Sequence, residues 1–198
     1  MEVKDREDKD IRQPDLKSMN MEELRNWVIG AGQPAFRAKQ IYQWFHVKLA
    51  DGTEEMTNLP KSLREKMDEY GIYGVSVVTR LISEDDGTNK FLFRLHDGNV
   101  IESVLMKYKH GNSVCISSQV GCRMGCRFCA TGRQGLQHSL STNEILNQIG
   151  SLPERERLTN VVFMGMGEPL DNLDNLLPAL EVLTSAWGFG WSPTRITV

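Results

Sequence analysis

The stretch that decides the fold and the chemistry of this chain is Cys115-Ile-Ser-Ser-Gln-Val-Gly-Cys122-Arg-Met-Gly-Cys126-Arg-Phe-Cys129. It contains all four cysteines of the 198-residue sequence. Cysteines gathered in one short stretch indicate metal or redox chemistry, whereas a disulfide framework would spread them along the chain.

The last three cysteines have the spacing C-x3-C-x2-C on a glycine-containing loop. Three thiolates so close in sequence can hold three corners of a cubane 4Fe-4S cluster and leave the fourth iron without a protein ligand. Structural zinc sites usually close with four ligands, and Cys115 would have to supply the fourth from a predicted strand, seven residues away. We therefore favour a cluster over a zinc site or unrelated free thiols.

The cysteine loop lies among strands that alternate with helices. We expect strands at residues 114–118 and 160–164 and from 195 onwards, with helices at 142–149 and 173–186. This alternation predicts parallel βα units, whose functional loops lie at the carboxyl ends of the strands. The fold class is α/β, the first half of a partial (β/α) barrel. Because the sequence stops inside a predicted strand, we expect a fragment of a longer protein.

Upstream of the cysteines, the pattern changes from helical to alternating. We predict helices at 20–30, 34–48 and 60–71, the second with Phe36, Ile41, Trp44 and Phe45 on its buried side. Strands follow at 75–82, 90–95 and 99–106, with a hairpin turn at Asp97-Gly98. The expected domains are a flexible tail at 1–19, a helical module at 20–73, antiparallel linker strands at 74–110 and an incomplete core at 111–198.

Composition adds few constraints. With 40% hydrophobic and 25% charged residues, the chain is typical of a soluble globular protein. No apolar run approaches the ~20 residues of a membrane span, and residues 1–12 lack the apolar segment of a signal peptide, so we expect a cytoplasmic protein without membrane contact. Between residues 103 and 143 there are five Lys or Arg and no acid, which suits a polyanionic substrate or a negatively charged cofactor.

A second motif, Met164-Gly-Met-Gly-Glu-Pro169, directly follows an apolar strand. Glycines at a strand end let the backbone approach a ligand closely. Considered without the cysteines, a plain Gly/Pro turn is the simpler interpretation of this motif.

The cysteine stretch together with Gly165-Met-Gly-Glu-Pro-Leu-Asp-Asn172 resembles the radical S-adenosylmethionine RNA methyltransferases of the RlmN type and their Cfr relatives, from about residue 20 to the end of the chain. The resemblance implies a 4Fe-4S cluster on Cys122, Cys126 and Cys129. It also implies that Gly167 and Glu168 contact S-adenosylmethionine.

The resemblance assigns two further residues. Glu102 matches the proton acceptor of the family, and Cys115 matches a thiol that resolves a protein–RNA intermediate through a transient disulfide bond. From the residues alone, Glu102 is a solvated strand carboxylate and Cys115 a small buried apolar residue.

The activity implied is methylation of carbon 2 of adenosine in 23S rRNA, at the peptidyl transferase centre, and in tRNA. The implied partners are these RNAs, bound in part by the helical module, and an external electron donor of the flavodoxin type; we expect a monomer. The family carries the methyl group on a cysteine near its C-terminus, whereas every cysteine here lies at or before Cys129, so we expect an inactive fragment. The alternatives are carbon 8 methylation of the Cfr type, a non-catalytic zinc- and RNA-binding module, and a remnant of a broken gene.

Overall fold

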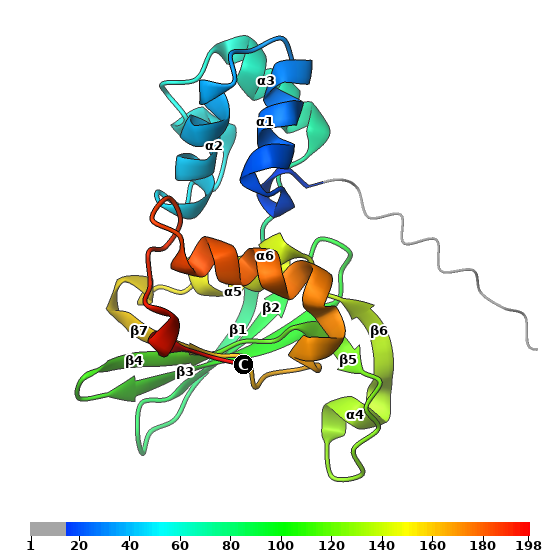
Figure 1. Cartoon of the computed structure of the whole chain (residues 1–198). Coiled ribbons are helices and arrows are strands. Elements are labelled where there is room, and N and C mark those ends of the chain that lie inside the picture. Colours follow the sequence, from blue (N-terminus) through cyan, green and yellow to red (C-terminus); the bar gives the residue numbers. More distant parts are fainter. Residues whose placement is uncertain (1–14) are drawn as a thin grey trace, which may run out of the picture.

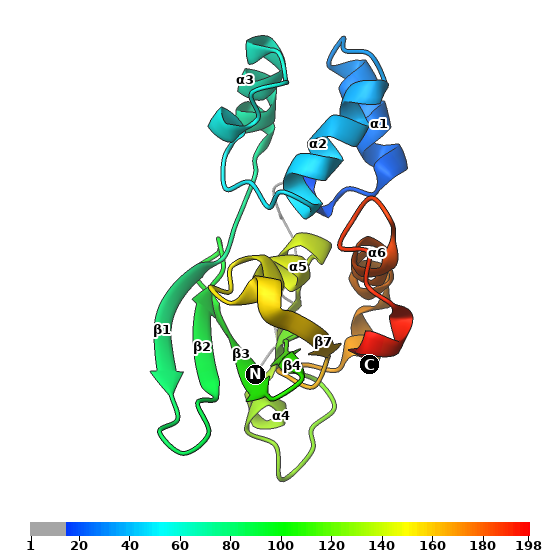
Figure 2. The same ribbon diagram turned by 90° about the vertical axis from the view of Figure 1, so that its left-hand side faces the viewer.

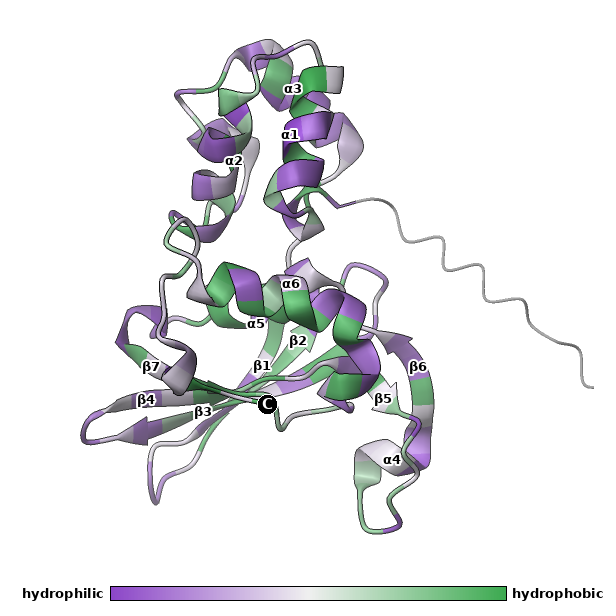
Figure 3. Ribbon diagram, viewed as in Figure 1, coloured by the Kyte–Doolittle hydropathy of each residue, from purple (hydrophilic) through white to green (hydrophobic). Residues whose placement is uncertain are grey.

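The computed structural model describes residues 15–198, and three helices form the first module of that part of the chain (Figure 1). They are α1 (Met21–Gly30), α2 (Phe36–His46) and α3 (Lys61–Tyr70), as the sequence predicts to within two residues. Asn20 begins α1 with a capping box, since its side chain accepts from the Glu23 amide and the Glu23 carboxylate accepts from the Asn20 amide. Figure 3 shows these helices banded in purple and green, as amphipathic helices should be.

The buried side of α2 is only partly the one predicted. Ile41 and Phe45 are buried in the core, and Trp44 is half-buried. Phe36 is 58% exposed, and the Arg37 guanidinium lies 5.0 Å from its ring centroid. The prediction failed here because Phe36 is the first residue of the helix, ahead of the turns that pack against the rest of the module.

Residues 15–19, which we assigned to a flexible tail, pack against the protein. Leu16–Ser18 form a short 3-10 helix, Leu16 is fully buried, and the Lys17 ammonium donates to the Ala50 carbonyl at 3.1 Å. The Asp15 carboxylate accepts from the Asn143 side-chain amide, which joins this segment to the second half of the chain. The predicted tail therefore does not extend to residue 19, and residues 1–14 lie outside the described part.

A six-stranded mixed sheet follows, with the order β1-β2-β3-β4-β7-β8. Strands β1 (Ser76–Ile82), β2 (Asn89–Arg94), β3 (Val100–Tyr108) and β4 (Gly111–Cys115) are antiparallel neighbours. Strands β7 (Leu158–Val162) and β8 (Ile196–Thr197) continue the sheet in parallel with β4. The antiparallel strands predicted as a linker are thus continuous with the core through the pairing of β3 with β4.

Helices α5 (Thr142–Gly150) and α6 (Leu173–Thr184) connect the parallel strands, as the βα pattern predicts. They pack against each other and lie over one face of the sheet (Figure 2). Short 3-10 helices occur at Thr53–Glu55, Arg155–Arg157, Pro169–Asn172 and Pro193–Arg195. None of the helices between residues 15 and 198 has the length and hydropathy of a membrane span.

A small second sheet and a short helix were not predicted. Strands β5 (Gln119–Cys122) and β6 (Gly135–Ser139) pair antiparallel, and α4 (Ala130–Gln134) lies between them in the chain. Together they form the projection at the lower right of Figure 1. Their sequences contain Gly, Ser and Gln without apolar alternation, so the signal for a strand is absent although the backbone pairs.

The two faces of the large sheet differ in burial. On β3, the residues Ile101, Ser103 and Leu105 are buried, whereas Glu102 and Val104 between them are half-buried. Because successive side chains of a strand point to opposite faces, the buried set lies under the helices and the other set lies on the opposite face. We call this opposite side the open face.

Burial on α2 can be tested with two substitutions of the same kind. Phe45→Ala should lower the free energy of unfolding by about 3–5 kcal/mol because Phe45 is 2% exposed and its removal leaves a cavity. Phe36→Ala should change it by less than about 1 kcal/mol, since little apolar area is lost and alanine is the better helix former. Urea denaturation measures both, and equal losses would show that the assignment of the buried side is wrong.

His46 supplies a pH dependence of stability. Burial, with a smaller effect from Lys17, lowers its pKa to about 3, while the unfolded chain binds the proton near pH 6.5. Below about pH 6.5 the unfolded state therefore binds a proton that the folded state does not bind. The free energy of unfolding falls by roughly 1.4 kcal/mol per pH unit towards pH 3. Replacing His46 with Gln should flatten this slope in denaturation curves recorded from pH 7 to pH 4. The same change at exposed His110 should leave the slope as it is.

Candidate active site

The cysteine loop connects β5 to α4. Cys122 ends β5 and is buried, Cys126 is exposed, and Cys129 is the half-buried residue that precedes α4. Gly125 turns the loop with a φ of 64°, a conformation that glycine adopts without strain. In the part of the chain that the structure describes, no three Cys, His, Asp or Glu side chains converge closely enough to hold a metal ion. The three thiols therefore share one loop but do not converge on a single point in this structure.

The surroundings of the thiols suit thiolate ligands. The backbone amide of Gly132, with a further one from Thr131, lowers the pKa of the Cys129 thiol. The Met124 amide points at the Cys122 sulfur at 3.5 Å. Phe128, between the second and third cysteines, is 92% exposed, so the outer side of the loop is open. Three thiols on a loop with amides aimed at sulfur are a donor set that fits an iron–sulfur cluster.

The glycine motif packs on the protein itself. It follows β7, and the Gly165 amide donates to the Ile116 carbonyl at 3.0 Å. A Cβ atom at Gly165 would lie 2.6 Å from that carbonyl oxygen, and one at Gly167 would lie 2.6 Å from the Gln119 Cβ. Gly167 also has a φ of 99°. These glycines are thus required by close contact with residues 116–119, a role that the sequence did not reveal.

The polar groups of the glycine motif are largely used within the protein. The Met166 carbonyl accepts from the amides of Ser118 and Gln119 at 2.8 and 3.2 Å. The Glu168 carboxylate accepts from the Leu170 amide at 3.2 Å and so begins the 3-10 helix Pro169–Asn172. Contact of Gly167 and Glu168 with S-adenosylmethionine stays a prediction.

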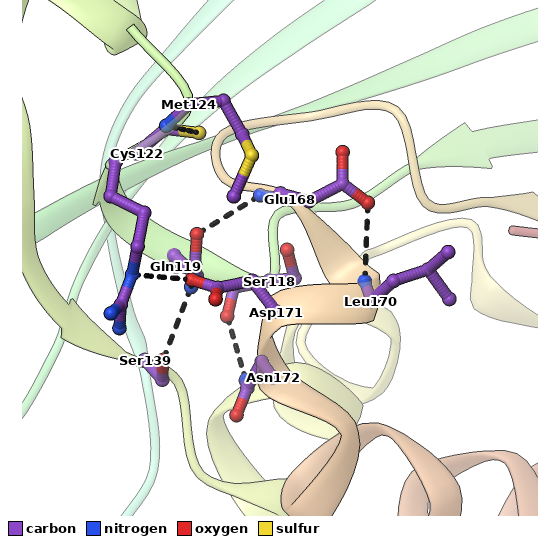
Figure 4. Close-up of polar contacts among 10 residues, drawn as sticks. Ser118, Gln119, Cys122, Met124, Ser139, Glu168, Leu170, Asp171 and Asn172 are labelled. Carbon is purple, nitrogen blue, oxygen red and sulfur yellow. Dashed lines mark hydrogen bonds and ion pairs between the residues drawn. The ribbon is translucent and has the colours of Figure 1, made fainter.

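One side chain links the glycine motif to the cysteine loop. Gln119 is fully buried at the start of β5; its Oε1 accepts from the Glu168 amide at 3.0 Å, and its Nε2 donates to Asp171 Oδ2 at 2.9 Å. The same Asp171 oxygen accepts from Arg123 Nε at 2.8 Å, and Arg123 follows Cys122 in the chain. Figure 4 labels Gln119, Asp171 and Cys122 around this junction. Sequence reasoning missed Gln119, Asp171 and Arg123. Their only signal was their place inside or beside the two motifs.

Glu102 and Cys115 lie on the open face of the large sheet. Val104 is paired with Cys115 across β3 and β4, and Glu102, two residues before Val104, points to the same side. The Glu102 carboxylate forms an ion pair with Lys90 at 2.7 Å, and burial raises the pKa of the Cys115 thiol. All four cysteines are free thiols, so the structure contains no disulfide bond.

A buried polar network lies behind this face. Gln148 of α5 is fully buried; its Oε1 accepts from Ser103 Oγ and from the Ser117 amide, both at 2.8 Å. Ser117 Oγ donates to the Glu102 carbonyl at 2.6 Å and accepts from the Met166 amide at 2.9 Å. Ser117 therefore ties the backbone of Glu102 to the glycine motif. A buried side-chain amide with hydrogen-bond partners of this kind fixes the positions of the segments that it joins.

Substitutions at two glycines with positive φ distinguish the energetic cost of close packing from the cost of backbone conformation. Gly98→Ala, at a hairpin turn with open space around it, should cost about 1–2 kcal/mol of unfolding free energy from the backbone alone. Gly167→Ala should cost about 1–3 kcal/mol more, because its Cβ also collides with Gln119. Thermal and urea denaturation of both variants measure the difference. Equal losses would mean that residues 165–167 are not held against residues 116–119.

Comparison with known families gives two matches along the chain. Residues 14–72 match the ribosomal RNA large subunit methyltransferase N-terminal domain, and residues 116–197 match the radical SAM superfamily. The first match covers the helical module. The second covers both loops of the candidate active site.

Whole-chain relatives agree with these matches. The chain is 52% identical over 187 residues to a probable dual-specificity RNA methyltransferase RlmN of Lachnoclostridium phytofermentans, covering 93% of this chain and 52% of that protein. It is 49% identical over 183 residues to the protein of the same name in Phocaeicola vulgatus, with 92% and 52% covered. The chain thus spans about half the length of these curated relatives.

A solved structure gives the same result in three dimensions. The crystal structure of a radical SAM methyltransferase from Sphaerobacter thermophilus superposes with a TM-score of 0.83 at 38% identity, covering 92% of this chain and 55% of that one. The α/β class and the partial radical SAM fold expected from the sequence are confirmed by this likeness. With these matches in both sequence and fold, the chain belongs to the RlmN family of radical S-adenosylmethionine methyltransferases.

Proposed function

We propose that this chain forms the radical-generating part of an enzyme that methylates carbon 2 of adenosine in RNA. The observation that carries the proposal is the junction of the cysteine loop with the glycine motif. The two loops are tied through Gln119, Asp171 and Arg123, within a fold shared with a radical SAM methyltransferase. The substrate class follows from relatives named as dual-specificity RNA methyltransferases.

Cys122, Cys126 and Cys129 would hold a 4Fe-4S cluster. When bound, the cluster would supply an iron that S-adenosylmethionine can chelate and an electron for its reductive cleavage, with an external flavodoxin-type protein as the electron source. The lowered pKa of Cys129 favours the thiolate that iron requires. Gly167 and Glu168, on the neighbouring loop, would contact S-adenosylmethionine.

Glu102 and Cys115 would act on the RNA adduct from the open face. Glu102 would accept the proton lost from adenine, and its carboxylate lies 2.7 Å from the Lys90 ammonium in a partly exposed ion pair. In a full-length enzyme, Cys115 would resolve the protein–RNA intermediate by forming a transient disulfide bond with the methyl-carrying cysteine, whose bond to the RNA adduct breaks in the same step. Their common orientation on neighbouring strands supports a shared substrate.

The helical module would bind RNA phosphates. The sequence from Gly30 to Ala50 contains three Lys or Arg and no acid, and Lys39 and Lys48 are exposed. A stretch of sequence with cations and no acid favours a polyanion. We propose 23S rRNA and tRNA as the substrates and a monomer as the working form. We expect no complete methyl transfer by this chain alone, because its four cysteines include no counterpart to the methyl-carrying cysteine of the family.

The test is anaerobic reconstitution of the chain with iron and sulfide, followed by reduction in the presence of S-adenosylmethionine. We expect about four iron and four sulfide ions per chain and release of 5'-deoxyadenosine. Alanine at Cys122, Cys126 or Cys129 should abolish both. Cys115→Ala is the matched control and should keep the cluster, since Cys115 lies on β4 outside the loop.

Other outcomes would refute the proposal. A colourless protein that retains one zinc ion and cleaves no S-adenosylmethionine would establish the zinc- and RNA-binding alternative. If Cys115→Ala also lost the metal, the ligand set would be wrong. Chromatography of nucleosides from RNA treated with a full-length relative separates carbon 2 from carbon 8 methylation, the alternative within the family.

A further inference from the structure

We propose that Gln119 and Asp171 are positioning residues that hold the cysteine loop and the glycine motif in one fixed arrangement. The inference deepens the proposed function and rests on it, because the two loops would bind the cluster and S-adenosylmethionine. Its physical basis is a chain of hydrogen bonds that joins the loops through a single carboxylate oxygen (Figure 4).

Both polar atoms of the Gln119 side chain have hydrogen-bond partners. Its Oε1 accepts from the Glu168 amide, and its Nε2 donates to Asp171 Oδ2 and, at 3.2 Å, to Ser139 Oγ of β6. The residue is 0% exposed, so water cannot replace any of these partners. Breaking a hydrogen bond of a buried amide costs more free energy than breaking one of an exposed amide, because the buried group is left without a partner.

Asp171 connects the buried Gln119 side chain to the cysteine loop. Its Oδ2 receives Gln119 Nε2 at 2.9 Å and Arg123 Nε at 2.8 Å. The Arg123 side chain is 59% exposed, and an exposed ion pair of this kind contributes little when its carboxylate is free to move. Here the carboxylate is held by Gln119, so Arg123 meets an acceptor whose position is already set.

The backbone around Asp171 is anchored independently. The Asn172 side-chain amide donates to the carbonyls of Ser118 and Leu140 at 2.9 and 2.8 Å, and the Asp171 amide donates to the Glu168 carbonyl at 3.1 Å. Asp171 therefore cannot follow Arg123 if the cysteine loop moves. The Gln119–Asp171 contact therefore connects an anchored segment to the cysteine loop through Arg123.

Four variants test this arrangement. Gln119→Glu keeps the acceptor for the Glu168 amide but places a carboxylate against Asp171. Asp171→Leu removes the shared acceptor, whereas Asp171→Asn retains an acceptor oxygen and is the conservative variant. Asn89→Asp is the matched control, because Asn89 is a fully buried hydrogen-bonded amide at the start of β2, outside both loops.

The first readout is hydrogen exchange in the metal-free chain, which does not depend on the cluster. Gln119→Glu and Asp171→Leu should speed the exchange of backbone amides at residues 123–129 and 168–171, and Asp171→Asn and Asn89→Asp should not. The second readout uses the reconstituted chain. Gln119→Glu and Asp171→Leu should raise the Kd for S-adenosylmethionine about tenfold and alter its effect on the electron paramagnetic resonance signal of the reduced cluster.

The proposal is overturned if Gln119→Glu exchanges and binds like the wild type, or if Asp171→Asn is as damaging as Asp171→Leu. It also fails if Asn89→Asp causes the same losses. If Gln119→Glu does not fold, the variant Arg123→Met tests the proposal instead, because Arg123 is the exposed end of these contacts. This variant must speed amide exchange at residues 123–129 and leave the exchange of the Glu168 amide unchanged. Failure of cluster assembly in the wild type would refute the proposed function and leave the exchange test valid.

Discussion

The contact between two loop segments at the edge of the sheet is the constraint on which the site depends. Because β4 and β7 are parallel neighbours, the segments that follow them leave at the same edge. Residues 165–167 lie so close to residues 116–119 that no side chain fits at Gly165 or Gly167. The segment after β4 continues into β5 and the cysteines, and the segment after β7 continues into Glu168. This backbone contact therefore holds the two segments against each other, and the side chains of Gln119 and Asp171 continue the connection to the cysteine loop.

Sequence patterns predicted most of the elements and failed where packing, not pattern, decides. The three N-terminal helices follow from apolar periodicity and from caps such as Asn20, strands β1 to β3 follow from alternation, and β7 follows from an apolar run. Strand β4 was predicted at 114–118 and lies at Gly111–Cys115. Strands β5 and β6 carry no such pattern. They pair with each other, and the start of β5 contacts the glycine motif, neither of which is visible in the sequence. Leu16 was missed because one apolar residue in a polar stretch shows no period, although it is fully buried.

The sequence pointed to candidate reactive groups of the site, which stay predictions, and not to the residues that support them. Spacing alone pointed to the three cysteines, and the resemblance added Glu102, Cys115, Gly167 and Glu168. Their supports, Gln119 and Asp171, are ordinary polar residues whose roles appear only when segments about fifty residues apart meet. The sequence also suggested that glycines at the strand end make room for a ligand. At Gly165 and Gly167 the space is taken by the protein's own residues 116–119.

The two faces of the sheet differ in how firmly their side chains are held. On the helix side, Gln148 satisfies Ser103 and Ser117 in a dry interior, where a broken hydrogen bond leaves an unsatisfied group. On the open face, Glu102 and Cys115 are half-buried, and the ion pair of Glu102 with Lys90 lies partly in solvent, where such a contact exchanges easily. Ser117 bonds to both sides, because it meets Gln148 behind the sheet and the Glu102 backbone within it. The side chains proposed to react thus stay accessible from the open face while the backbone that carries them is held in place.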